Sequence, residues 1–329
     1  MPWTWNPKFE IAQRPDSQPR SGAGLKRKSH EGMPENHGRG AGPGGYCHRV
    51  GIRRYPADRH LSLKDGKVTV RKLLARSYLL STVAASLRRV NARRSLHKLI
   101  KANKLEFYGG GDATIQEIRA RHLFEIAARS TGWCPSSIYP IGGASGALLS
   151  YILLRVLEEF PFTNALELGA GHSTRMLDAW SKEKGTFACT LEHDEAWASR
   201  MSSLCVSENS RILYRPLEDV HLEGRHCRWY SKAKAELDGK KHDLLIVDGP
   251  VGTKRFSRIG VSSIIPEVLS TDWLIIWDDI DRPGDLESFA LVIRLLRERG
   301  IEHNNLILEG DGRVGLIFTD KFSGVRHLW

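Results

Sequence analysis

The stretch Ala165-Leu-Glu-Leu-Gly-Ala-Gly-His-Ser-Thr174 decides the fold of this 329-residue sequence. A short apolar strand runs directly into Gly169 and Gly171, and a helical pattern begins near Ser173. Glycines at such a bend let the backbone approach a ligand closely, while the amide groups of the helix N-terminus point at that ligand. The stretch therefore predicts a strand, a ligand-binding bend and a helix.

Strand and helix patterns continue to alternate from this stretch to the C-terminus. The expected strands are 165–168, 186–192, 211–214, 243–248, 273–277, 305–309 and 313–319, and the expected helices between them are 173–182, 195–208, 261–269 and 286–299. Alternation with buried strands predicts an α/β fold with a doubly wound, mostly parallel, seven-stranded sheet. The last two strands flank the tight turn Gly310-Asp-Gly312 and must form an antiparallel hairpin.

Acidic residues near the glycine bend indicate the kind of ligand. A dinucleotide-binding loop would carry a third glycine where this chain has Thr174, and Glu167 precedes the bend. An acid there suits a cationic ligand such as S-adenosylmethionine. Glu192 ends the next strand, 21 residues after Gly171, where a carboxylate can accept both ribose hydroxyl groups. The alternative for the glycine bend is a plain strand–turn–helix corner without a ligand. The alternative for Glu192 is a solvated glutamate at the end of a strand.

Four segments, taken together, resemble a known family. They are Leu166-Glu-Leu-Gly-Ala-Gly-His-Ser-Thr174, Leu191-Glu-His-Asp-Glu195, Leu245-Ile-Val-Asp-Gly-Pro250 and Ile275-Ile-Trp-Asp-Asp279. Over about residues 140–320 their order and spacing resemble class I S-adenosylmethionine-dependent methyltransferases, closest to the group related to catechol and macrolide-sugar O-methyltransferases. The resemblance implies a Rossmann-like fold and S-adenosylmethionine as cofactor.

The resemblance also implies a role for individual residues. The methionine part of the cofactor would lie among Glu167, Gly169, Gly171 and Ser173. His172 would contact the cofactor or pack in the glycine loop, and His193, directly after Glu192, would lie near the ribose. Glu192 would hold the ribose, and Glu218 or Asp219 would meet the adenine edge, although a helix-cap role suits those two acids equally. Asp248 would face the cofactor from the neighbouring strand.

Three carboxylates follow two of the expected strands, Asp248 after one and Asp278 with Asp279 after the other. The ends of parallel strands face one crevice, where clustered carboxylates repel one another unless a cation or proton intervenes. Mg²⁺ prefers such ligands, and related O-methyltransferases use a metal here to activate an acceptor hydroxyl. Asp248 and Asp279 are therefore the expected catalytic residues, and all three are expected metal ligands.

This sequence departs from the metal-dependent pattern in two places. Gly249-Pro250 follows Asp248 where sugar-methylating relatives often have Gly-x-His, and Arg282 follows the aspartate pair. An arginine-neutralised cluster without a metal is therefore the alternative. Nearby, Lys254, Arg255 and Arg258 are expected in a solvated loop, with binding of an anionic substrate as the other interpretation.

The net charge of +11 belongs to the N-terminal third, because residues 1–111 hold 23 lysines and arginines against 7 acids. We expect residues 1–60 to be a disordered Gly/Pro/Arg-rich tail, because they carry little apolar pattern. Residues 61–111 are expected to be a basic amphipathic helical extension. Its segment 67–104 either packs on the main domain or contacts an anionic membrane surface or nucleic acid. Residues 112–160 are an expected helical lead-in with Asp112 as N-cap, and 161–329 the cofactor-binding domain.

No apolar run is long enough for a transmembrane segment, and the first thirty residues lack the apolar core of a secretory signal. Five scattered cysteines without metal or redox spacing suggest reduced thiols and a cytoplasmic protein.

Three functional classes remain open. The favoured class is O-methylation of a small molecule, sugar or glycan precursor. The second is an RNA or other nucleic-acid methyltransferase that uses residues 67–104 as an arm, although few aromatic residues interleave the charges there. The third is a non-catalytic adenosine-ligand sensor or an NAD-dependent enzyme, which the missing third glycine disfavours.

Overall fold

A computed structural model describes residues 98–109, 112–138, 145–310 and 312–329 of the chain. The expected tail at 1–60, and residues 67–97 of the basic segment, lie outside the described residues. At the end of that segment, residues 98–103 are helical. Leu99 and Ile100 of this helix pack against the core, so this part of the segment contacts the main domain.

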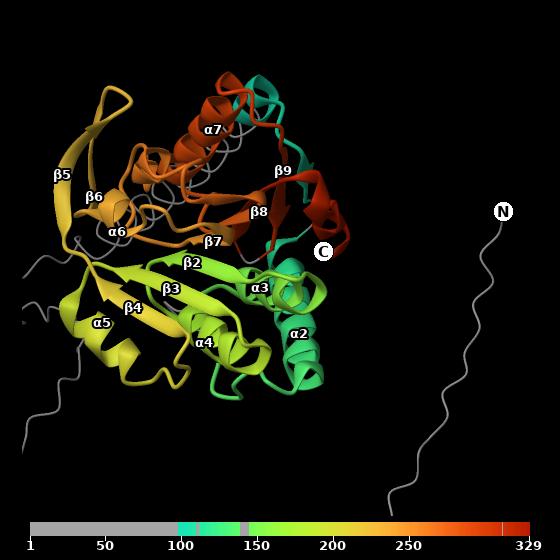
Figure 1. The fold of residues 1–329 in the computed structure, drawn as a ribbon. Helices are drawn as coiled ribbons and strands as arrows, with labels where there is room; N and C mark the ends of the chain where they lie inside the picture. Colours follow the sequence, from blue (N-terminus) through green and yellow to red (C-terminus); the bar gives the residue numbers. More distant parts are fainter. Residues whose placement is uncertain (1–97, 110–111, 139–144, 311) are drawn as a thin grey trace, which may run out of the picture. The chain divides into compact units, whose positions relative to one another are not determined.

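Eight strands form the main sheet in the order β1-β9-β10-β8-β7-β2-β3-β4 (Figure 1). Their bounds are β1 Phe107–Tyr108, β2 Asn164–Leu168, β3 Phe187–Glu192, β4 Ser210–Tyr214, β7 His242–Val247, β8 Leu269–Trp277, β9 Asn304–Glu309 and β10 Arg313–Phe318. The neighbours from β8 to β4 are parallel, whereas β10 is antiparallel to both β8 and β9. This confirms the doubly wound sheet with a C-terminal hairpin, to which β1 adds a short edge strand.

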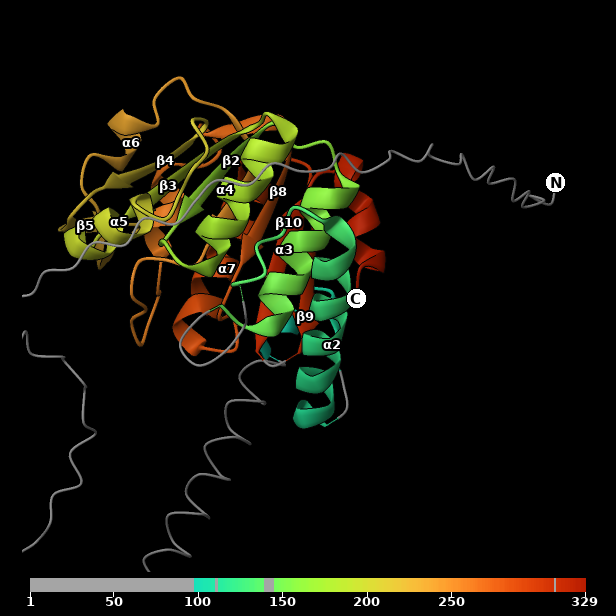
Figure 2. The same ribbon diagram turned by 90° about the horizontal axis from the view of Figure 1, so that it is seen from below.

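Helices cover both faces of this sheet. Their bounds are α2 Ala113–Thr131, α3 Ala147–Glu159, α4 His172–Lys184, α5 Glu195–Ser202, α6 Ala233–Glu236 and α7 Pro283–Glu298, with 3₁₀ turns η1 Ile259–Ser263 and η2 Asp320–His327. Figure 2 shows α4, α3 and α2 next to one another along one face. The Asp112 side chain accepts the N–H groups of Thr114 and Ile115, as expected of an N-cap. No helix in the described residues is long and apolar enough to cross a bilayer.

The core has two layers because side chains alternate along each strand. In β7, Leu244 and Ile246 pack toward α2, α3 and α4, while Leu245 and Val247 pack toward η1 and α7. All four are fully buried, as the apolar runs of the central strands predict. The carboxyl ends of these strands are thereby held at one edge of the sheet.

Three segments differ from the sequence-based expectation. The helix expected over 195–208 ends at Ser202 as α5, and turns follow it. Between β4 and β7 the chain forms a separate hairpin of β5, Leu217–Leu222, and β6, Arg225–Tyr230, which leaves the main sheet in Figure 1. The helix expected at 261–269 was wrong: η1 is a single 3₁₀ turn, followed by turns that lead into β8. Pro266 explains this break, because proline lacks the N–H group that a continuing helix needs.

Candidate functional site

A cleft of about 800 Å³ opens where β2, β3, β7 and β8 end. Loops after these four strands line it, together with the start of α3 and the turn between β9 and β10. Its volume suits a nucleoside-sized ligand together with part of a second molecule. The predicted site residues among its lining are Gly169, Glu192, His193, Asp248, Asp278 and Asp279.

The glycine bend after β2 is tightly packed against the bend after β7. Gly169 has a φ of +93°, and a Cβ placed on it would lie 2.9 Å from the backbone nitrogen of Gly249. A side chain is therefore excluded at Gly169 both by conformation and by space. The next residue, Ala170, lines the cleft, and its carbonyl accepts a hydrogen bond of 2.8 Å from the Trp197 indole.

Glu167 lies beneath this bend and not in the cleft wall. Its side chain is fully buried, and its Oε2 atom accepts hydrogen bonds from the hydroxyl groups of Thr174 at 2.6 Å and Thr190 at 2.8 Å. Burial raises the pKa of Glu167 to about 7, although neighbouring hydroxyl groups oppose the shift. Thr174, at the position of the absent third glycine, also accepts the N–H of Gly171 and so ties the bend to Glu167.

The start of α4 stands behind the bend. Gly171, His172 and Ser173 are not part of the cleft lining, although the side chain of Ser173 is buried. The structure therefore brings the bend itself to the cleft, whereas these three predicted residues lie outside its lining.

Glu192 organises the region between the ends of β2 and β3. Its Oε2 atom accepts the N–H of Ala170 at 2.8 Å, and its Oε1 atom accepts those of His193 at 2.6 Å and Asp194 at 2.8 Å. The carboxylate is 4% exposed and lines the cleft. These contacts fix the Glu192 carboxylate at the wall of the cleft, in the place expected for a ribose-binding acid.

The structure does not bring Glu218 and Asp219 to the cleft. Both are exposed side chains of β5 in the separate hairpin, and Asp219 lies 3.3 Å from His226 there. An aromatic residue that the sequence pattern did not single out, Trp197 of α5, lines the cleft and is 39% exposed. A tryptophan five residues beyond the expected ribose-binding strand end is the signal that could have identified it.

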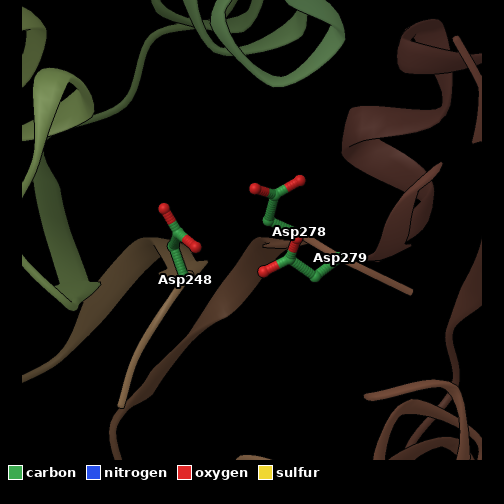
Figure 3. Close-up of side chains that lie close together, drawn as sticks. All are labelled: Asp248, Asp278 and Asp279. Atoms are coloured by element: carbon green, nitrogen blue, oxygen red, sulfur yellow. The ribbon is translucent and has the colours of Figure 1, made fainter. Parts of the chain in front are cut away.

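The three aspartates form a compact group at the ends of β7 and β8 (Figure 3). One carboxylate oxygen from each of Asp248, Asp278 and Asp279 lies within 4.8 Å of the others. Burial, followed by repulsion from the other two aspartates, raises the pKa of Asp278 well above its usual range. Burial also raises the pKa of Asp248 to about 6. Asp279 has a φ of +61°, a strained conformation typical of functional sites.

Arg258 is a buried member of this acidic cluster. Its side chain is only 3% exposed, and its Nη2 atom lies 2.8 Å from Asp279 and 3.3 Å from Asp248. The expectation of a solvated loop was therefore wrong for Arg258. Arg282 lies 2.7 Å from Asp279, so the arginine neutralisation considered from the sequence involves two arginines.

The other two candidate cations, and His303, which could serve as a base for a hydroxyl acceptor, are not part of the cleft lining. Arg255 pairs with Glu287 and is mostly exposed, and Lys254 does not line the cleft. His303 precedes β9 and contacts the carbonyl of Ile301 through its Nδ1 atom, at the end of β9 opposite the cleft-lining turn.

The donor set of the acidic cluster fits a hard divalent cation. Carboxylate oxygens are the ligands that Mg²⁺ prefers. The buried Asp285 lies 3.5 Å from Arg258 and belongs to the same charge network. A bound cation favours ionisation of all four aspartates (Asp248, Asp278, Asp279 and Asp285), and with the two arginines the group would then carry two negative charges, which one divalent ion balances.

Comparison with known proteins adds similar folds at low identity. No family model matches the chain, and no curated protein matches it. It is similar to the S-adenosylhomocysteine-bound methyltransferase PaMTH1 of Podospora anserina, at 15% identity and a TM-score of 0.38, covering 70% of this chain and 96% of that one. It is also similar to a putative caffeoyl-CoA O-methyltransferase of Staphylococcus aureus, at 14% identity and a TM-score of 0.36, covering 70% and 99%.

The strand order and the antiparallel β10 decide the fold. It is that of the class I methyltransferases. The TM-scores and identities of the solved structures are too low to carry a substrate or a residue role to this chain.

Proposed function

We propose that this chain is an S-adenosylmethionine-dependent methyltransferase that transfers the methyl group to a hydroxyl oxygen of a small molecule, sugar or glycan precursor. One observation carries the proposal. The side-chain-free bend at Gly169, the carboxylate of Glu192 and the acidic cluster around Asp248 share a single cleft. A cofactor site and a place for an acceptor oxygen are thereby adjacent, as methyl transfer requires.

The cofactor half of the cleft is the part around the β2 and β3 ends. Glu192 accepts the ribose hydroxyl groups, because its carboxylate is fixed by three backbone N–H groups and still faces the cavity. The bend at Gly169 and Ala170 lets the methionine part approach the backbone, and Trp197 and His193 form the neighbouring wall. Glu167 is sealed beneath the bend and so does not itself face the sulfonium.

The acceptor half of the cleft combines acidic and apolar surfaces. Asp248, Asp278 and Asp279 would hold Mg²⁺, which would lower the pKa of an acceptor hydroxyl and orient it. Leu148, Leu149 and Val314 also line the cleft and suit the carbon skeleton of an acceptor. These side chains exclude water and position the acceptor for in-line attack on the methyl group.

Calorimetric titration of the full chain with S-adenosylmethionine, S-adenosylhomocysteine and NAD tests the cofactor assignment. We expect micromolar dissociation constants for the two sulfur nucleosides and no measurable heat with NAD. Binding of NAD, with no heat from either sulfur nucleoside, would contradict the proposal.

The metal assignment has a separate test. Once an acceptor is identified, methyl transfer should stop when EDTA removes divalent ions and should return when Mg²⁺ is restored. Transfer that survives chelation would show that the arginines alone neutralise the cluster.

A further inference from the structure

The guanidinium of Arg258 joins three segments of the chain at the acidic cluster. Its Nε atom donates to the carbonyl of Pro250 at 3.3 Å, and its Nη1 atom donates to the carbonyl of Asp278 at 3.2 Å. Its Nη2 atom reaches the Asp248 and Asp279 carboxylates. The planar fork of arginine can satisfy this many acceptors at once, whereas the point charge of lysine cannot.

Asp285 fixes Arg258 from the side of α7. Its Oδ1 atom lies 3.5 Å from the Arg258 Nε atom and 3.5 Å from the Trp277 indole nitrogen, and the residue is fully buried. A buried guanidinium held by a buried carboxylate keeps its charge and its position, because moving either partner would leave the other buried and unpaired.

The charge of Arg258 therefore acts directly on any cation that the three aspartates bind. Arg258 contacts two of these aspartates and, together with Arg282, leaves two negative charges when the three aspartates and Asp285 are all ionised. Charges a few ångströms apart in a buried site change each other's energy strongly, because little water screens them.

We propose that Arg258 is the residue that sets the charge of this cluster, so that it binds one divalent cation with restrained affinity. Asp285 is the positioning residue that holds Arg258 in place. This inference rests on the proposed metal site, and it adds a residue whose charge opposes the metal that the aspartates attract. A weakly held cation can leave and return with each acceptor.

The experiment measures Mn²⁺ binding to the full chain by the electron paramagnetic resonance signal of free Mn²⁺. Four variants accompany the wild type: Arg258→Met, Arg258→Lys, Asp285→Asn, and Arg258→Met combined with Asp285→Asn. Thermal unfolding and S-adenosylhomocysteine binding establish that each variant is folded, since Glu192 and the Gly169 bend lie outside the altered pair.

The expected pattern follows from charge. Arg258→Met should tighten Mn²⁺ binding by at least about tenfold, and Asp285→Asn should weaken it by about threefold or more. The double variant restores the net charge and should return to within about threefold of the wild type, as should Arg258→Lys. If Arg258 and Asp285 had only a structural role, the two single substitutions would not change the Mn²⁺ affinity in opposite directions, and their effects would not cancel in the double variant.

Three results would overturn the inference. One is a folded Arg258→Met variant that binds Mn²⁺ no tighter than the wild type. Another is an Asp285→Asn variant that binds Mn²⁺ as well as the wild type, which decides the matter even if Arg258→Met does not fold. The third is the absence of Mn²⁺ binding in both the wild type and Arg258→Met while both bind S-adenosylhomocysteine. The proposed metal site then fails as well, whereas the cofactor site stands.

Discussion

Glu192 is the residue on which the cofactor assignment depends most. Its two oxygens receive three backbone N–H groups from the loops after β2 and β3, so the carboxylate is fixed before any ligand arrives. A preorganised acceptor of this kind loses little freedom when it binds ribose hydroxyl groups. The carboxylates of Glu218 and Asp219 have no such setting, because they are exposed on β5.

Replacement of Glu192 by alanine should therefore weaken S-adenosylhomocysteine binding by about 1–3 kcal/mol, because the ribose loses a charged partner in a buried site. Calorimetry measures the change, and thermal unfolding checks that the loops remain folded. The matched control is Glu218→Ala, which should leave the affinity unchanged. Equal affinity in the wild type and Glu192→Ala would remove Glu192 from the site.

His242, at the start of β7, makes a prediction about stability. It is 5% exposed, neither ring nitrogen has a hydrogen-bond partner among the described residues, and burial lowers its pKa from 6.5 to about 4. Between these pH values the unfolded chain binds a proton that the folded chain does not. The contribution of the buried neutral imidazole to the free energy of unfolding is therefore fully present above about pH 6.5. It is lost as the pH falls toward 4, on the order of 3 kcal/mol in all.

Urea unfolding of the wild type and of His242→Leu, at a series of pH values, measures this effect. Carboxyl groups that titrate in the same range do so in both proteins and cancel in the difference. The wild type should lose stability relative to the variant as the medium is acidified from pH 6.5 to 4. Parallel curves would show that the buried imidazole does not respond as argued.

Among the elements, the bend between β2 and α4 is the most constrained. Gly169 combines a positive φ with direct contact to the Gly249 backbone, so Gly169→Ala must strain the bend and push the two loops apart. We expect a loss of about 2–4 kcal/mol in unfolding free energy, together with at least tenfold weaker S-adenosylhomocysteine binding.

Gly185, the C-cap of α4, provides the control for this substitution. It also has a positive φ, of +69°, but nothing lies within 4 Å of the position where a Cβ would stand. Gly185→Ala should therefore cost only about 1 kcal/mol and leave the ligand affinity intact. If both variants behave alike, the close approach of the two loops is not what requires glycine at position 169.

The sequence predicts the main elements because their patterns are regular. The apolar runs of β7 and β8 and the Gly310-Asp-Gly312 turn predict the central strands and the terminal hairpin. The β5–β6 hairpin is missed because the apolar residues of its short strands do not alternate regularly with polar ones. Its signal is the two-residue turn Glu223-Gly224, in which both residues have positive φ, as such hairpins require.

The candidate site is predictable only where a residue ends a strand. Glu192, Asp248 and the aspartate pair 278–279 do so, and the parallel sheet brings them to one edge. Arg258 lies ten residues beyond its partner Asp248, in a loop whose path cannot be predicted from any periodicity of the sequence. Glu167 is predicted to contact the cofactor because it precedes the bend. The sequence pattern cannot indicate that the hydroxyl groups of Thr174 and Thr190 bind its carboxylate inside the fold.

At the scale of the whole molecule, the cleft is built from one part of the chain. Among the described residues, all those that line it lie between Ser145 and Val314. A chain that lacks residues 1–97 should therefore bind S-adenosylhomocysteine within about twofold of the full chain, because its cleft lining is intact. Calorimetry on both proteins checks this. A large loss of affinity in the shorter chain would mean that the N-terminal third contributes to the site.

The central claim is that the cleft between the ends of β2, β3 and β7 holds a sulfur nucleoside. A crystal structure of the full chain with S-adenosylhomocysteine tests it most directly. We predict that the ribose hydroxyl groups lie within hydrogen-bond distance of Glu192, and that the homocysteine part passes Gly169 toward Asp248. A ligand bound elsewhere, with Glu192 making only its contacts to Ala170, His193 and Asp194, would contradict this account.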